Sequence, residues 1–77
     1  MESLYKTRDL AEAAALIIKK LPLKGIERDH STCWFVFENK AVCEEVSNLF
    51  FFGELLVNAR EFHEAIGRLK NRIFSQS

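Results

Sequence analysis

Three segments of the chain carry apolar residues at the spacing of an amphipathic helix, near residues 8–20, 40–52 and 59–74. Pro22 follows the first segment and Gly53 follows the second. Proline disfavours helical backbone in the residue before it, and glycine readily adopts the left-handed conformation that ends many helices. The pattern therefore predicts three helices with defined ends.

Polar residues stand where each helix is expected to begin. Thr7 is the expected N-cap of the first helix, and Asn39 is that of the second. Asn58, followed three residues later by Glu61, resembles a capping box at the start of the third helix. These signals support the same three boundaries as the apolar spacing does.

Between the first two helices, residues 23–38 are typical of a β-hairpin with a polar turn. Gly25 indicates a bulge in its first strand. Weaker extended segments lie at 4–7 and 55–57. We expect a small two-layer α+β domain spanning residues 1–77, with an antiparallel sheet centred on the hairpin and packed by three helices. If both weak strands form, the order is a ferredoxin-like βαββαβ followed by a C-terminal helix; if neither forms, it is α-β-β-α-α.

The strand "TCWFVFE" is apolar on both of its faces. Strand alternation sends Cys33, Phe35 and Phe37 one way and Trp34 and Val36 the other. In a two-layer domain the helices cover one face of the sheet. We expect the C-terminal helix to cross over and cover the second face. The alternatives are a homodimer contact and a platform for a ligand or a nucleic acid.

The run "FFFG" raises the same question at the end of the second helix. The apolar stripe of that helix comprises Val42, Val46, Leu49 and Phe50. Phe51 projects away from this stripe, so it is either turned inward with Phe52 at Gly53 or exposed as a contact surface. We expect the inward turn. On the first helix, Glu12 lies opposite the apolar stripe. Leu16 lies toward that polar side and is a weaker contact candidate. The candidate interaction surface therefore comprises Trp34, Val36, Phe51, Phe52 and Leu16.

The charge balance gives no general attraction to nucleic acid or to anionic membranes. The 77 residues contain 11 basic and 11 acidic side chains, a formal net charge of zero. A nucleic-acid interface would need a local patch, for which Tyr5 and Trp34 could stack on bases while Lys24, Arg28 and Lys40 contact phosphates. Arg68, Lys70 and Arg72 form a second basic row, which we interpret as a solvated helix face.

The sequence predicts no catalytic, cofactor or metal site. Its histidines, cysteines and acidic residues lack metal-ligand spacing, and no phosphate-binding or nucleophile motif occurs. Cys33 and Cys43 are expected to be reduced and buried, with a disulfide as the alternative. No apolar run is long enough to span a membrane. We expect a soluble cytoplasmic protein that is not an enzyme.

The segments "YKTRDLAEAAALI", "WFVFENKAVCEEV" and "VNAREFHEAIGRLKNRIF" resemble a family of short uncharacterised proteins from bacteria, archaea and their phages. The resemblance covers nearly the whole chain. That family has no established activity, so the resemblance implies a fold but no reaction. The matching positions are Tyr5, Thr7, Asp9, Leu10, Phe35, Phe37, Phe62, Leu69 and Lys70.

A second, partial resemblance links "FVFENKAVCEEV" and "GELLVN" to RNA-recognition-motif domains, whose aromatic strands stack bases. This chain lacks the basic residue and glycine that precede those aromatics in that family. The sequence therefore favours a protein–protein interaction or assembly module, with self-association as one form of it. A small single-stranded nucleic-acid-binding protein is the alternative.

Overall fold

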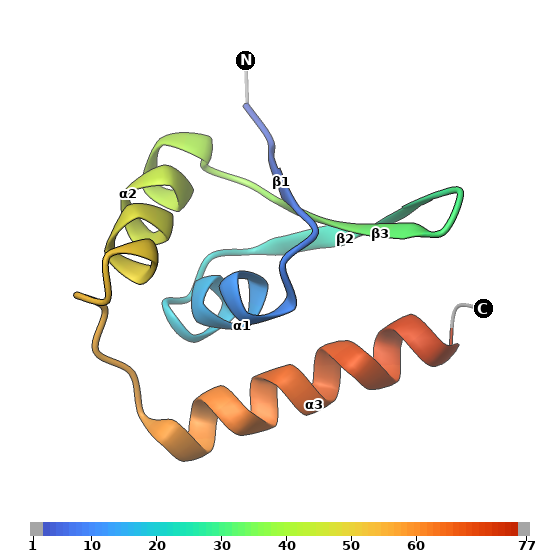
Figure 1. The fold of residues 1–77 in the computed structure, drawn as a ribbon. Helices are drawn as coiled ribbons and strands as arrows, with labels where there is room; N and C mark the ends of the chain where they lie inside the picture. Colours follow the sequence, from blue (N-terminus) through green and yellow to red (C-terminus); the bar gives the residue numbers. More distant parts are fainter. Residues whose placement is uncertain (1–2, 76–77) are drawn as a thin grey trace.

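The computed structural model describes residues 3–75 and arranges them as a three-stranded antiparallel sheet and three helices (Figure 1). The strand order β1-β3-β2 places the second strand of the hairpin in the centre of the sheet. This confirms the α+β class and the sheet centred on residues 23–38. The elements are β1 (Tyr5–Thr7), α1 (Leu10–Ile18), β2 (Leu23–Asp29), β3 (Thr32–Phe37), α2 (Lys40–Phe51) and α3 (Ala59–Ser75).

The register of the sheet confirms the predicted alternation and the predicted bulge. Thr7 of β1 and Ile26 of β2 both pair with Phe35, while Lys6 and Gly25 both pair with Val36. The pairing shifts between residues 23 and 25, which leaves an extra residue in β2 where glycine was expected to mark a bulge.

The strand expected at 55–57 does not form. Residues 54–58 connect α2 to α3 without regular structure, and the Leu56 side chain is 86% exposed. The Leu56 carbonyl, which a sheet would use for pairing, instead accepts a hydrogen bond from Lys19 Nζ at 3.1 Å. The observed order is βαββαα, so α3 stands where a ferredoxin-like fold would have its last strand.

Two of the three predicted helix caps need correction. Asp9, not Thr7, caps α1, because its Oδ1 accepts a hydrogen bond from the Glu12 backbone N–H at 3.0 Å. Asn39 precedes α2 in a left-handed conformation, with φ 64°, and its side chain makes no capping bond. Asn58 does cap α3 as expected, with its Oδ1 accepting from a backbone N–H at 3.0 Å.

All three helices pack on the same face of the sheet. Figure 1 shows α1 between the sheet and α3, with α2 beside α1. The expectation that α3 covers the second face is therefore wrong. The alanines of α1 let neighbouring elements approach closely, so α3 completes the core from the far side of α1. The core cluster comprises Ala13, Ala14, Leu16, Phe35, Phe37, Cys43, Ala65 and Leu69.

Because α1 has neighbours on several sides, its expected polar side is also buried. Residues 12–16 are five consecutive buried positions. Leu16 is 0% exposed and is one of the largest fully buried side chains, so it belongs to the core and not to an interaction surface. Glu12, which the helix pattern placed opposite the core, is 6% exposed.

Candidate interaction surfaces

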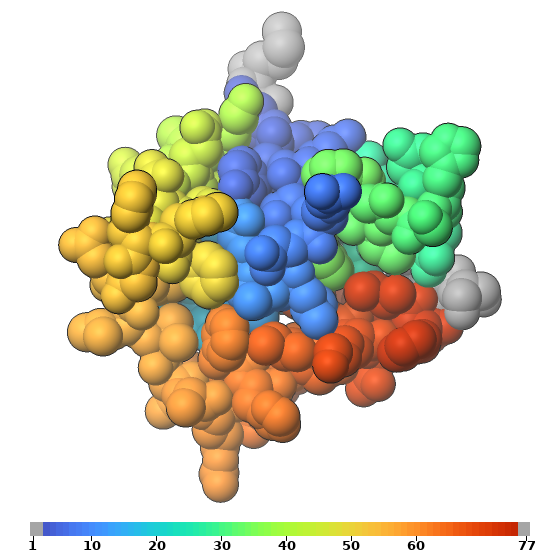
Figure 2. All heavy atoms as spheres, in the orientation of Figure 1, coloured from blue at the N-terminus to red at the C-terminus, as the bar shows by residue number. Residues whose placement is uncertain are grey.

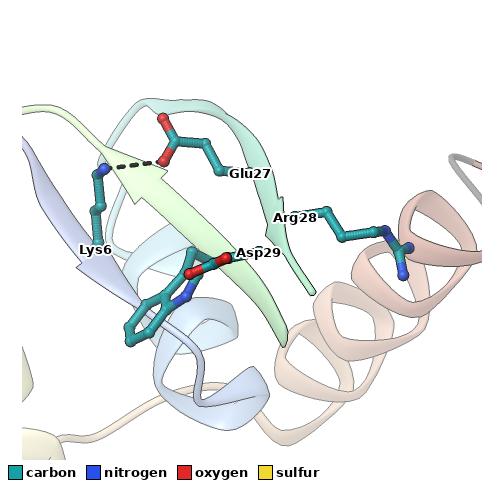
Figure 3. A pocket seen from close by; sticks show the side chains of 5 residues that line it. Lys6, Glu27, Arg28 and Asp29 are labelled. Atoms are coloured by element: carbon teal, nitrogen blue, oxygen red, sulfur yellow. Dashed lines mark hydrogen bonds and ion pairs between the residues drawn. The ribbon is translucent and has the colours of Figure 1, made fainter. Parts of the chain in front are cut away.

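The second face of the sheet is covered by long polar side chains. Lys6 on β1 and Glu27 on β2 form an ion pair of 2.9 Å that passes over the central strand β3 (Figure 3). Val36 lies between β1 and β2 on this face and is only 4% exposed. The aliphatic stems of such side chains can cover apolar surface while the charged ends stay in water. The Lys6 and Glu27 side chains therefore cover Val36 on the second face of the sheet.

Trp34 remains partly exposed beside this ion pair. It lines a shallow hollow of about 430 Å³ together with Lys6, Glu27, Arg28 and Asp29. Arg28 extends toward α3, where its Nη2 donates to the Ile73 carbonyl at 3.4 Å (Figure 3). Trp34 is therefore accessible from one side, whereas Val36 is too buried to contact a partner.

A more strongly exposed apolar surface lies at the end of α2. We call Leu49, Phe51, Phe52 and Leu56 the Phe patch. Phe51 is 78% exposed, Phe52 76% and Leu56 86%, and Leu49 is 42% exposed. All four fall within eight consecutive residues, at the end of α2 and in the connection that follows it. Figure 2 shows this segment, yellow to orange, projecting at the left edge. The expected inward turn of Phe51 and Phe52 does not occur.

The backbone at the end of α2 explains this exposure. Gly53 has a φ of 71°, its N–H bonds the Phe50 carbonyl at 3.2 Å, and the Glu54 N–H bonds the Leu49 carbonyl at 2.8 Å. These two bonds make a Schellman motif, which confirms Gly53 as the helix stop. The chain therefore reverses after Phe52, and both phenylalanines stay on the outside of the turn.

The rotation of α2 about its axis also differs from the apolar pattern. Its buried residues are Cys43 and Ser47, whereas Val42 and Leu49, expected in the core, are 44% and 42% exposed. Ser47 faces the core because its hydroxyl donates to Glu12 Oε2 at 2.9 Å. A buried carboxylate needs such donors, since an unsatisfied charge inside a protein is strongly unfavourable.

Two further hydroxyl groups complete the shell around Glu12. The Tyr5 hydroxyl donates to Oε2, and the Thr7 hydroxyl donates to Oε1 at 2.9 Å. The cluster thus ties β1, α1 and α2 together through one carboxylate. Within the described residues, no buried side-chain nitrogen or oxygen lacks a hydrogen-bond partner. The cluster is therefore a hydrogen-bonded structural element that joins three parts of the fold.

Two ionisable groups near Glu12 are shifted. Burial, and next the hydrogen bond to Glu12, raise the pKa of Tyr5 above its usual value. Burial, and next the negative charge of Glu12, raise the pKa of the Cys43 thiol. Cys43 donates to the Glu38 carbonyl at 3.3 Å, and both Cys33 and Cys43 are free thiols. A thiol held in its neutral form is a poor nucleophile.

The residues considered for nucleic-acid contact do not gather on one surface. Tyr5 turns to the helix face to reach Glu12, whereas Trp34 lies on the opposite face of the sheet. Lys24 and Arg28 are four residues apart in β2, about 13 Å along a strand. Lys40 begins α2. The two aromatic side chains therefore cannot form one stacking platform.

The apolar run at 55–57 predicts a strand and gives no sign that Leu56 lies at the surface, yet Leu56 is exposed. Its neighbours Leu55 and Val57 are half-buried, so exposure alternates from residue to residue along this run. Within residues 3–75 no cluster of three or more histidine, cysteine or acidic residues could hold a metal ion. The same residues contain no helix long and apolar enough to cross a membrane.

The chain belongs to the family described as Domain of unknown function (DUF5659), whose model matches residues 2–75. This match confirms the resemblance to a family of uncharacterised proteins. No curated protein matches the chain, and no solved structure does.

Proposed function

We propose that this protein is a non-enzymatic assembly module that binds a second copy of itself through the Phe patch. The observation that supports the proposal is the exposure of Phe51 and Phe52, at 78% and 76%, next to an equally exposed Leu56. Leaving a phenylalanine in water instead of burying it forgoes about 1.5–3 kcal/mol. A domain of this size has little stability to lose in that way.

The area of the patch agrees with a modest dimer. An aromatic side chain buries about 150–250 Å² when fully covered. The four residues of the Phe patch therefore offer on the order of 500 Å² per copy, or about 1,000 Å² for two copies. That total is near the lower limit of specific interfaces, which predicts a dimer that dissociates on dilution.

The shape and charge of the region also favour association. Leu49 and Phe51 are two positions apart in α2, so they lie on nearly opposite sides of the helix. A helix end that is apolar on all sides is typical of a buried element. The net charge of zero means that two copies do not repel each other overall.

Nucleic-acid binding receives less support from the same structure. The Trp34 hollow contains the carboxylates of Glu27 and Asp29, which repel phosphates, and Lys6 is already paired with Glu27. Arg28 is directed toward α3. The charges beside the accessible aromatic residue therefore favour a protein partner over a phosphate backbone.

Sedimentation velocity over a concentration series tests the proposal. We expect the wild-type protein to shift from monomer to dimer as concentration rises, and the Phe51→Ser/Phe52→Ser variant to remain monomeric. Phe74→Ser is the matched control, because Phe74 is 73% exposed and lies at the other end of the helical layer, in α3. A wild-type protein that stays monomeric at every concentration would refute self-association. Equal loss of dimer in both variants would refute the assignment to the Phe patch.

A further inference from the structure

Two arginines border an apolar groove on a different side of the molecule. The groove lies between the end of α1, the start of β2 and the second half of α3, and has a volume of about 280 Å³. Leu69, at its base, is 2% exposed. Arg68 and Arg72, about one helical turn apart in α3, also line the groove. The complete lining is Ile17, Leu21, Leu23, Arg68, Leu69 and Arg72.

The two guanidinium groups have no partners within residues 3–75. Neither takes part in an ion pair or a side-chain hydrogen bond there. Like charges four residues apart on a helix repel each other. Among the described residues no acidic side chain lines the groove. Glu61 and Glu64 line the neighbouring hollow together with Lys20, and Arg68 stands between the two because it lines both. The groove is thus apolar inside and positive at its rim.

We propose that this groove binds a small amphipathic anion, with an aliphatic chain against Leu21 and Leu23 and a carboxylate between Arg68 and Arg72. The planar guanidinium group binds a carboxylate through two parallel hydrogen bonds, and two arginines can share one anion. The volume is close to the lower end of small-molecule sites, so the groove suits a small ligand. This site is independent of the Phe patch.

The site differs in kind from the Trp34 hollow. That hollow is lined by two carboxylates and two cations beside Trp34, so it does not favour a ligand of either charge. In the groove both charged groups are cations and every other lining residue is aliphatic. Charge and hydrophobicity therefore point to the same chemical class of ligand, a short-chain acyl anion.

Isotope-edited NMR of the full chain with octanoate, octanol and octyl phosphate as probes tests the proposal. Octanoate and octyl phosphate are used below the concentrations at which they form micelles, and octanol is used below its solubility limit. We expect octanoate to shift the signals of Ile17, Leu21 and Leu23, and octanol to bind about tenfold more weakly because it lacks the charge. Equal affinity for octanol and octanoate, or no shift with millimolar octanoate, would overturn the proposal. Tighter binding of octyl phosphate would overturn the choice of a carboxylate.

Variants of α3 locate the charged contact. Arg68→Gln and Arg72→Gln should each weaken octanoate binding about tenfold. Lys70→Gln is the matched control, because Lys70 is an exposed cation of the same helix that does not line the groove, and it should change affinity less than twofold. Octanoate shifts centred on the Phe patch, and lost in Phe51→Ser/Phe52→Ser, would show adsorption to exposed apolar surface and overturn the assignment.

Discussion

The Ser47 hydroxyl of α2 donates a 2.9 Å hydrogen bond to Oε2 of Glu12 on α1, joining positions 35 residues apart in the chain. This contact fixes which side of α2 faces the core. Because Ser47 faces the core, Leu49 lies on the flank of α2 and is partly exposed. A buried polar contact thereby determines part of the apolar surface that the protein presents to a partner.

Replacing Ser47 with alanine should destabilise the fold by about 1.5–3 kcal/mol, the range for a hydrogen bond to a charged group. The substitution leaves the Glu12 carboxylate short of a donor in a buried position. Urea unfolding followed by circular dichroism measures the change. Ser75→Ala is the control, because the Ser75 hydroxyl is exposed and bonds only carbonyls of its own helix. A similar small effect for both variants would contradict the role assigned to Ser47.

Alkaline conditions should weaken the fold through Tyr5. Its pKa is raised in the folded protein, so the neutral phenol is favoured there, while an unfolded tyrosine ionises near pH 10. The stabilisation is therefore fully present below about pH 10 and is lost as the pH rises through the higher folded pKa. We expect Tyr5→Phe to be less stable than wild type at neutral pH but to lose less stability above about pH 10.

The free energy of unfolding of both proteins, measured from neutral to alkaline pH, checks this prediction. Lysines titrate in the same range and are common to both proteins, so the difference between the two curves isolates Tyr5. Parallel curves across the whole range would show that Tyr5 ionises equally in the folded and unfolded states.

Two leucines distinguish the core from the surface. Leu16→Ala should cost about 2–5 kcal/mol, because Leu16 is fully buried and its loss leaves a cavity. Leu56→Ala should change stability by less than about 0.5 kcal/mol in the monomer, since Leu56 is 86% exposed. Thermal unfolding at low protein concentration measures both. Comparable losses in the two variants would place Leu56 in the core and contradict its assignment to the Phe patch.

The local features of the fold could be predicted from the sequence, because they depend on residues close together in the chain. Alternation along "TCWFVFE" separates Phe35 from Trp34 correctly, since the period of a strand is fixed by its backbone. Gly25 lies at the register shift of β2, as expected. Gly53 ends α2, because its positive φ is backbone geometry that glycine adopts readily.

Features that depend on distant partners could not be predicted in this way. Nothing in residues 40–52 indicates that Ser47 faces the core, because its partner Glu12 lies on another helix. The pattern of α1 likewise places Leu16 and Glu12 on a polar side, whereas enclosure by neighbouring elements buries both. The apolar stripe of α3 shows that the helix is packed on one side. It does not show which face of the sheet the helix packs against, because that depends on the course of the chain before α3.

The candidate surface could be predicted only in part. The sequence favours an inward turn of Phe51 and Phe52 with exposure as the alternative, and the structure shows both exposed. Trp34 is partly exposed, but Val36 is hidden beneath the Lys6–Glu27 pair, which forms only when β1 and β2 flank β3. The Arg68/Arg72 groove also depends on tertiary structure, since its walls come from three elements.

NMR amide shifts of the wild-type protein, recorded from dilute to concentrated solution, detect self-association through the Phe patch and locate the contact. We expect concentration-dependent shifts concentrated in residues 49–56, with smaller changes along the exposed flank of α2. Shifts centred on Trp34 and its neighbours would place the contact on the second face of the sheet instead. Spectra that do not change with concentration would contradict self-association altogether.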